Sequence, residues 1–119
     1  MAKRPVLLVG VIFLLLGLLG FVSNPLIGEN ALFASDTVHN LIHVIIGVIL
    51  LAVAYWSSEN YLLWLKIVGV ALFLLGAIGL ATVPSLGGTL LGIFHTNGEY
   101  NWFHVIAGAV VFIAGVYGK

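Results

Sequence analysis

The sequence predicts an all-α membrane protein with four transmembrane helices, arranged as two tandem helical hairpins with pseudo-two-fold symmetry along the membrane normal. Three features predict this class: an apolar composition, four long apolar runs and an internal repeat. Of the 119 residues, 62% are hydrophobic and only 7% are charged, whereas soluble domains are about 45–50% apolar and about 25% charged. The chain cannot cover itself with a charged surface, so lipid is its expected solvent.

The four apolar runs have lengths close to those of membrane-spanning helices. A helix needs about 20 residues, within a range of about 17–25, to cross about 30 Å of hydrocarbon, where only helical backbone groups find partners. We interpret the first run as a retained helix and not as a cleaved signal peptide, because no small-x-small cleavage site follows it. The fourth run is short, and Tyr100 and Asn101 are expected to extend it into the membrane interface. The runs are Pro5–Val22, Val38–Trp56, Leu62–Val83 and Trp102–Tyr117.

The chain, one domain over 1–119, contains a helix–loop–helix unit twice, at 6–56 and at 65–117. The stretch "VGVIFLLLGLLG", Val9–Gly20, aligns without a gap with "VGVALFLLGAIG", Val68–Gly79. The glycines at equivalent positions suit close packing of helices, since small residues let helix backbones approach in lipid. Each unit has an even number of spans, so both units share one orientation and the symmetry axis is expected along the membrane normal.

The charged residues predict how the chain is oriented. The loops expected at 23–37 and 84–99 contain acidic residues but no Lys or Arg. The positive-inside rule therefore predicts a multi-pass protein of the cell (inner) membrane, with both termini cytoplasmic and both of these loops outside. The apolar residues of the loops are expected to cap the helices or to fold back onto the membrane surface. The cations on which this prediction rests are Lys3, Arg4, Lys66 and Lys119.

The motif Asn-x-x-His-x-x-x-Gly occurs once in each unit, over Asn40–Gly47 and Asn101–Gly108. Its polar residues share one helical face, and polar side chains in a membrane helix normally face the protein interior. Ser35 or Asp36 is the candidate N-cap of the helix that carries His43. At about 1.5 Å per residue, His43 lies roughly 10 Å below Asp36, inside the outer leaflet. The symmetry predicts that His43 and His104 approach each other if their helices line the axis.

The simplest interpretation of the motif is structural. Each His would then be held by an Asn or a backbone carbonyl, in interhelical hydrogen bonds of about 0.6 kcal/mol on average. On this interpretation the protein is a non-enzymatic membrane protein, either a homo-oligomer or an accessory subunit of a larger complex. Its partners are then the lipid bilayer and other membrane subunits.

Two alternatives make the histidines ligands. In the first, His43 and His104 are the axial ligands of a haem or another tetrapyrrole, with Asn40 and Asn101 beside them in the cofactor site. In the second, they bind a divalent metal ion, because two His four residues apart suit one metal on one helix face. Against the metal, His39 is matched by Tyr100 in the other unit. The candidate metal ligands are His39, His43, His95 and His104.

Other classes of function have less support. The net charge is zero, which gives no electrostatic case for a nucleic-acid partner, and the absence of Cys excludes disulfides, iron–sulfur clusters and thiol nucleophiles. Paired carboxylates, a phosphate-binding loop and a dinucleotide fingerprint are also missing, so no catalytic residue is assigned. A small carrier or pore with a His gate is the third alternative, although no membrane-embedded carboxylate supports it.

The stretches "FLLLGLLGF", "LFASDTVHNLIHVIIG" and "YNWFHVIAG" resemble a family of small four-helix bacterial membrane proteins that is classed only as a domain of unknown function. The resemblance covers most of the chain, roughly Val6 to Gly115. It implies four spans and a bacterial or archaeal membrane. It brings no reaction, substrate or cofactor.

Overall fold

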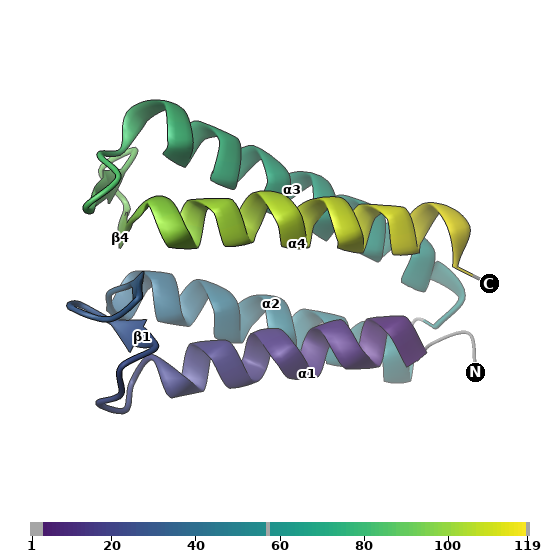
Figure 1. Ribbon diagram of the computed structural model, residues 1–119. Helices are drawn as coiled ribbons and strands as arrows, with labels where there is room; N and C mark the ends of the chain where they lie inside the picture. The colour runs from purple at the N-terminus through teal and green to yellow at the C-terminus, as the bar shows by residue number, and fades with distance from the viewer. Residues whose placement is uncertain (1–3, 57, 119) are drawn as a thin grey trace.

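A computed structural model describes residues 4–56 and 58–118, and its four α-helices form two antiparallel hairpins (Figure 1). Helix α1 lies beside α2, α3 lies beside α4, and both ends of the chain lie at the end of the molecule opposite the strands. The 3-10 helix η1, Ser58–Asn60, joins the hairpins. The predicted all-α class is therefore confirmed. The helices are α1 Arg4–Leu19, α2 Thr37–Trp56, α3 Tyr61–Thr82 and α4 Gly98–Tyr117.

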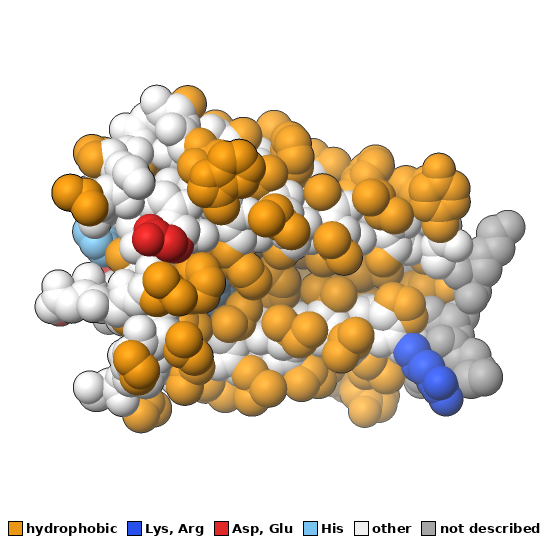
Figure 2. Space-filling view, in the orientation of Figure 1, with side chains coloured by type: hydrophobic (Ala, Val, Ile, Leu, Met, Phe, Trp, Pro, Cys, Tyr) orange, Lys and Arg blue, Asp and Glu red, His pale blue; other side chains and the backbone are white. Residues whose placement is uncertain are grey.

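The helices have the composition of membrane spans. Helices α2, α3 and α4 are each long and apolar enough to cross a membrane. On the face shown in Figure 2, apolar side chains cover much of the helices, the acidic and His side chains that are visible lie near the strands, and a cation lies at the opposite end. Two of the cations used to predict the orientation, Lys3 and Lys119, lie outside the described residues.

Helix α1 is shorter than the sequence predicts. It has 16 residues and ends at Leu19, not at Val22, so its length of about 24 Å falls short of the roughly 30 Å of a hydrocarbon core. Asn24 explains the early end: its Nδ2 donates hydrogen bonds to the carbonyl oxygens of Leu19 at 2.8 Å and Val22 at 2.6 Å. The last carbonyls of a helix need such partners, and here a loop side chain supplies them.

Helix α4 begins before the apolar run Trp102–Tyr117, as the expected extension by Tyr100 and Asn101 requires. It begins at Gly98 and has 20 residues, because the Asn97 side chain caps it by accepting a hydrogen bond from the backbone N–H of Tyr100. Tyr100, expected in the membrane interface, is only 1% exposed and belongs to the protein core. Helix α4 therefore includes Tyr100 and Asn101, as the predicted extension of the fourth span requires, and the Tyr100 side chain packs inside the protein.

Very short strands in the two loops cap one end of each hairpin. Strands β1 and β2 pair in parallel, and β3 and β4 pair antiparallel. The apolar loop residues Leu90 and Phe94 are buried with Val83 at the end of α3, as the capping prediction requires. The strands are β1 Ile27–Gly28, β2 Phe33–Ala34, β3 Gly88–Leu90 and β4 Phe94–Thr96.

Glycines set the closest approach of the helices within each hairpin. A Cβ atom on Gly47 would lie 2.5 Å from the backbone nitrogen of Leu14 and 2.7 Å from the backbone oxygen of Gly10. In the second hairpin, Gly108 lies against the backbone of Gly69 and Phe73 in the same way. Neither position has room for a side chain, because the obstacle is backbone.

The substitution Gly47→Leu should force α1 and α2 apart. Overpacking of this kind typically destabilises a protein by about 1–3 kcal/mol, and the loss should be measurable as the free energy of unfolding in detergent micelles. Val48→Leu is the matched control, because Val48 is the next residue of the same helix and is exposed; it should change stability by less than about 0.5 kcal/mol. Equal effects of the two variants would contradict the close approach.

Candidate metal centre

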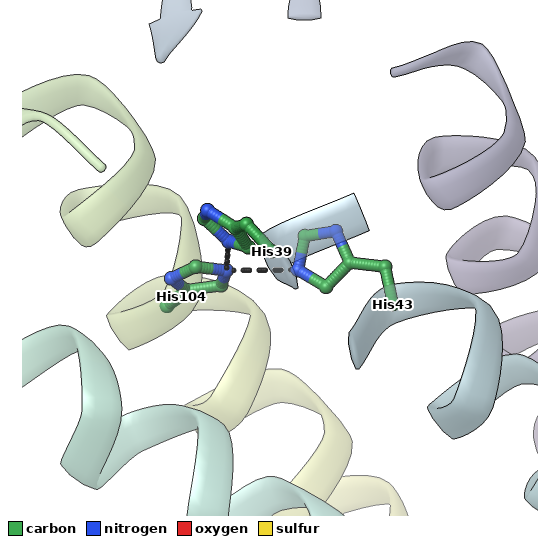
Figure 3. Close-up of side chains that lie close together, drawn as sticks. All are labelled: His39, His43 and His104. Atoms are coloured by element: carbon green, nitrogen blue, oxygen red, sulfur yellow. Dashed lines mark hydrogen bonds between the residues drawn. The ribbon is translucent and has the colours of Figure 1, made fainter. Parts of the chain in front are cut away.

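Three histidines from the two hairpins meet in the protein core (Figure 3): His39 and His43 come from α2, and His104 comes from α4. Nε2 of His104 lies 3.0 Å from Nε2 of His43 and 3.3 Å from Nε2 of His39. One ligand nitrogen from each of the three rings lies within 4.8 Å of the other two, and each residue is at most 2% exposed. The predicted approach of His43 to His104 is confirmed.

Helix geometry explains why these side chains converge. His39 and His43 are four residues apart, so they lie one above the other on the face of α2 that is buried. His104 lies on the buried face of α4. The three rings sit among apolar and aromatic side chains, with Phe94 at 4.4 Å from His39 and Phe13 at 5.3 Å from His43, measured between ring centroids.

A second layer of contacts orients the rings. The Tyr100 hydroxyl lies 2.9 Å from Nδ1 of His43, and the carbonyl oxygen of His95 lies 2.8 Å from Nδ1 of His39. The ring of Tyr100 also stacks on both His39 and His104. Metal-binding histidines usually have such a partner on the nitrogen that does not face the metal. The nitrogens that face one another are therefore the ones free to bind a ligand.

The position of Tyr100 in the sequence indicates a role in this site, although Tyr100 stands where the other repeat unit has His39. Tyr100 precedes His104 by four residues, just as His39 precedes His43, so both stand one turn before a cluster histidine. The difference between His39 and Tyr100 argued against a metal site because residues at equivalent positions of a repeat were expected to have the same role. In the structure the two residues have different roles. His39 contacts His104 and is a third candidate ligand, whereas the Tyr100 hydroxyl contacts Nδ1 of His43.

The ring hydrogens limit which of these contacts are hydrogen bonds. A carbonyl oxygen only accepts, so Nδ1 of His39 carries a hydrogen and Nε2 of the neutral ring has a lone pair. Nε2 of His104 faces the other two Nε2 atoms, yet a neutral ring nitrogen either donates one hydrogen or accepts with one lone pair. Three neutral rings therefore cannot form two full hydrogen bonds here. A metal ion among them would bind all three lone pairs.

The spacing fits a small metal ion better than a haem. Zinc–nitrogen bonds of about 2.0–2.1 Å in a tetrahedron place two ligand nitrogens about 3.3 Å apart, and the observed separations are 3.0 and 3.3 Å. Axial haem ligands lie on opposite faces of a flat macrocycle, so their nitrogens are separated by two metal–nitrogen bonds, about 4 Å. The 3.0 Å between Nε2 of His43 and Nε2 of His104 is nearer to the first of these separations than to the second.

The two motif asparagines contact other groups than the histidines. Oδ1 of Asn40 accepts a hydrogen bond from the Ser35 hydroxyl at 2.6 Å, and Oδ1 of Asn101 accepts one from the Thr96 hydroxyl at 3.0 Å. In these bonds the Asn side chains therefore do not hold the histidines, contrary to one form of the structural interpretation. Each amide also lies against a glycine: Asn40 against Gly20, which directly follows α1, and Asn101 against Gly79 of α3.

His95 contacts the three-histidine cluster through its backbone and not through its ring. It lies in β4, its carbonyl oxygen contacts His39, and its backbone N–H donates to Asp36. Its ring lies beside Gly87, within 3.4 Å of where a Cβ would be, and does not join the three clustered nitrogens. Of the four candidate metal ligands, the structure thus brings three together.

The sequence matches the family described as "Domain of unknown function (DUF4383)" over residues 3–117. The chain belongs to this family. The match confirms the resemblance to an uncharacterised family. No curated protein and no solved structure matches the chain.

The substitution Tyr100→Phe should leave Nδ1 of His43 buried without its hydroxyl partner. An unsatisfied buried polar group destabilises a protein by about 1–3 kcal/mol, which a denaturation curve in detergent can resolve. Tyr117→Phe is the control, since Tyr117 is exposed at the end of α4, and it should have almost no effect. If both variants were as stable as the wild type, the hydroxyl contact would have no structural role.

Proposed function

We propose that this protein is a non-enzymatic integral membrane protein that binds one transition-metal ion through His39, His43 and His104. The proposal is carried by the convergence of three imidazole nitrogens inside an apolar core. Imidazole suits zinc, copper, iron and nickel, whereas calcium and magnesium prefer oxygen ligands. Three protein ligands also leave one position open for water or another small ligand.

Three neutral rings can form only one of the two Nε2–Nε2 contacts as a full hydrogen bond, which favours this function over purely structural histidines. A buried polar network is stabilising when every member is satisfied, and a partly satisfied one is worse than an apolar core. The structural role expected for the whole motif then belongs to Asn40 and Asn101, whose oxygens bond to Ser35 and Thr96. The two residue types of the motif have separate tasks on this account.

We further propose that the four helices form a bundle that arose by duplication of one hairpin and lies in a bacterial inner membrane. The duplication is supported by equivalent contacts in the two hairpins, such as Gly47 on Gly10 and Gly108 on Gly69. The proposed topology has both termini in the cytoplasm and the 23–37 and 84–99 loops outside, because the cations avoid those loops.

Single cysteines test this topology, since the chain has no Cys of its own. A membrane-impermeant maleimide should label Leu86→Cys in spheroplasts, because Leu86 is exposed in the 84–99 loop. Glu59→Cys, in the exposed turn between the hairpins, should be labelled only after the membrane is permeabilised. The opposite labelling pattern would show that the orientation is the reverse of the proposed one. Labelling of both sites in intact spheroplasts would contradict the proposed topology.

Titration of the purified protein with Zn²⁺ or Cu²⁺ tests metal binding. The wild type should bind one equivalent by calorimetry and elemental analysis, and acidification should release the ion, because only unprotonated imidazole binds metal. Replacing His39, His43 or His104 by Gln should remove the high-affinity binding. His95→Gln should retain it, since the His95 carbonyl remains.

A second control separates ligand loss from loss of structure. Asn101→Ala should lower stability, because Thr96 loses its acceptor, yet leave one metal ion bound per chain. If the wild type bound no metal, or if the His and Asn variants lost it alike, the proposed function would be wrong and the structural interpretation of the histidines would stand.

A further inference from the structure

The side chain of Asp36 links the two hairpins beside the three histidines. It directly precedes α2, and its Oδ1 accepts a hydrogen bond from the backbone N–H of His39 at 2.9 Å, as an N-cap does. Its other oxygen, Oδ2, accepts a hydrogen bond from the backbone N–H of His95 at 3.0 Å. One carboxylate thus holds the start of α2 and strand β4 of the other hairpin.

The hydrogen bond between Asp36 and His95 of β4 is connected to the three histidines through His39. The residue whose N–H binds Asp36 is also the one whose carbonyl oxygen contacts Nδ1 of His39 at 2.8 Å. The position of that carbonyl decides which nitrogen of His39 carries the hydrogen, because the hydrogen goes to the nitrogen that faces an acceptor. With the hydrogen on Nδ1, the lone pair of Nε2 points towards His104.

We propose that Asp36 is a positioning residue for His39: it holds the main chain of His95 so that His39 keeps its Nδ1–H form and presents Nε2 to the metal. The expected effect of Asp36 on metal affinity rests on the proposed function. Its effect on the ring hydrogen of His39 does not depend on metal. Groups of this kind, one step behind the ligands, typically change metal affinity by about 10–100-fold when they are replaced.

The second hairpin supplies a matched control at Asn97. Its Oδ1 caps α4 by accepting from Tyr100 N–H at 3.0 Å, and its Nδ2 donates to the Leu32 carbonyl of the other hairpin at 2.9 Å. Asn97 therefore also combines a helix cap with a link between hairpins, but its link leads to no histidine. A serine at either position keeps one cap oxygen and loses the link.

The test compares Asp36→Ser with Asn97→Ser in the full-length protein. Zn²⁺ affinity, measured by calorimetry in detergent, should fall by about 10–100-fold in Asp36→Ser and stay within about threefold of the wild type in Asn97→Ser. Circular dichroism and unfolding curves establish that both variants are folded. Equal affinities in the two variants, or an unchanged affinity in Asp36→Ser, would overturn the inference.

Nitrogen-15 NMR of the imidazole rings provides a second readout that needs no metal. In the metal-free wild type and in Asn97→Ser, His39 should carry its hydrogen on Nδ1, and in Asp36→Ser a substantial fraction should move to Nε2. An unchanged His39 in Asp36→Ser would refute the positioning role. If the wild type failed to bind Zn²⁺ while Asp36→Ser still shifted the hydrogen, the proposed function would fail and the positioning role would stand.

Discussion

A polar side chain inside an apolar protein must find its partners within the protein, because neither lipid nor a packed core supplies them. This constraint governs the end of the molecule that carries the strands. The Oδ1 atoms of Asn40 and Asn101 satisfy it with hydroxyl groups, although Nδ2 of Asn101 is buried without a partner among the described residues. His39 and His43 satisfy it at Nδ1 with a carbonyl and a phenol. The Nε2 atoms that remain face one another, and on the proposed function a bound metal ion satisfies all of them at once.

The same constraint determines how the hairpins meet. Within each hairpin, glycines allow contact between the backbones of the two helices, and one glycine lies against the amide of Asn40 or Asn101. Between the hairpins, the polar contacts gather near the strands: His104 with the two histidines of α2, Tyr100 with His43, and Asp36 with β4. On the proposed function, a bound metal ion joins the two hairpins at the point where their packing is least apolar.

Sequence patterns predict the parts of this structure that depend on repetition and periodicity. The spacing of Asn40 and His43 places both on a buried face, and the repeat predicts that His43 meets His104. The end of α1 at Leu19 was missed because it depends on the loop residue Asn24, whose Nδ2 donates a hydrogen bond to the Leu19 carbonyl. The second oxygen of Asp36 and the His95 carbonyl were missed because residues far apart in sequence meet there only after folding.

X-ray absorption spectroscopy of the zinc-loaded protein tests the central claim most directly, because it reports the atoms around the metal. The account predicts about three nitrogen ligands at about 2.0–2.1 Å with the scattering pattern of imidazole, and one further light atom in the open position. The pattern should be lost in the His43→Ala, His104→Ala double variant. A shell of oxygen ligands without imidazole scattering, unchanged in that variant, would contradict the account.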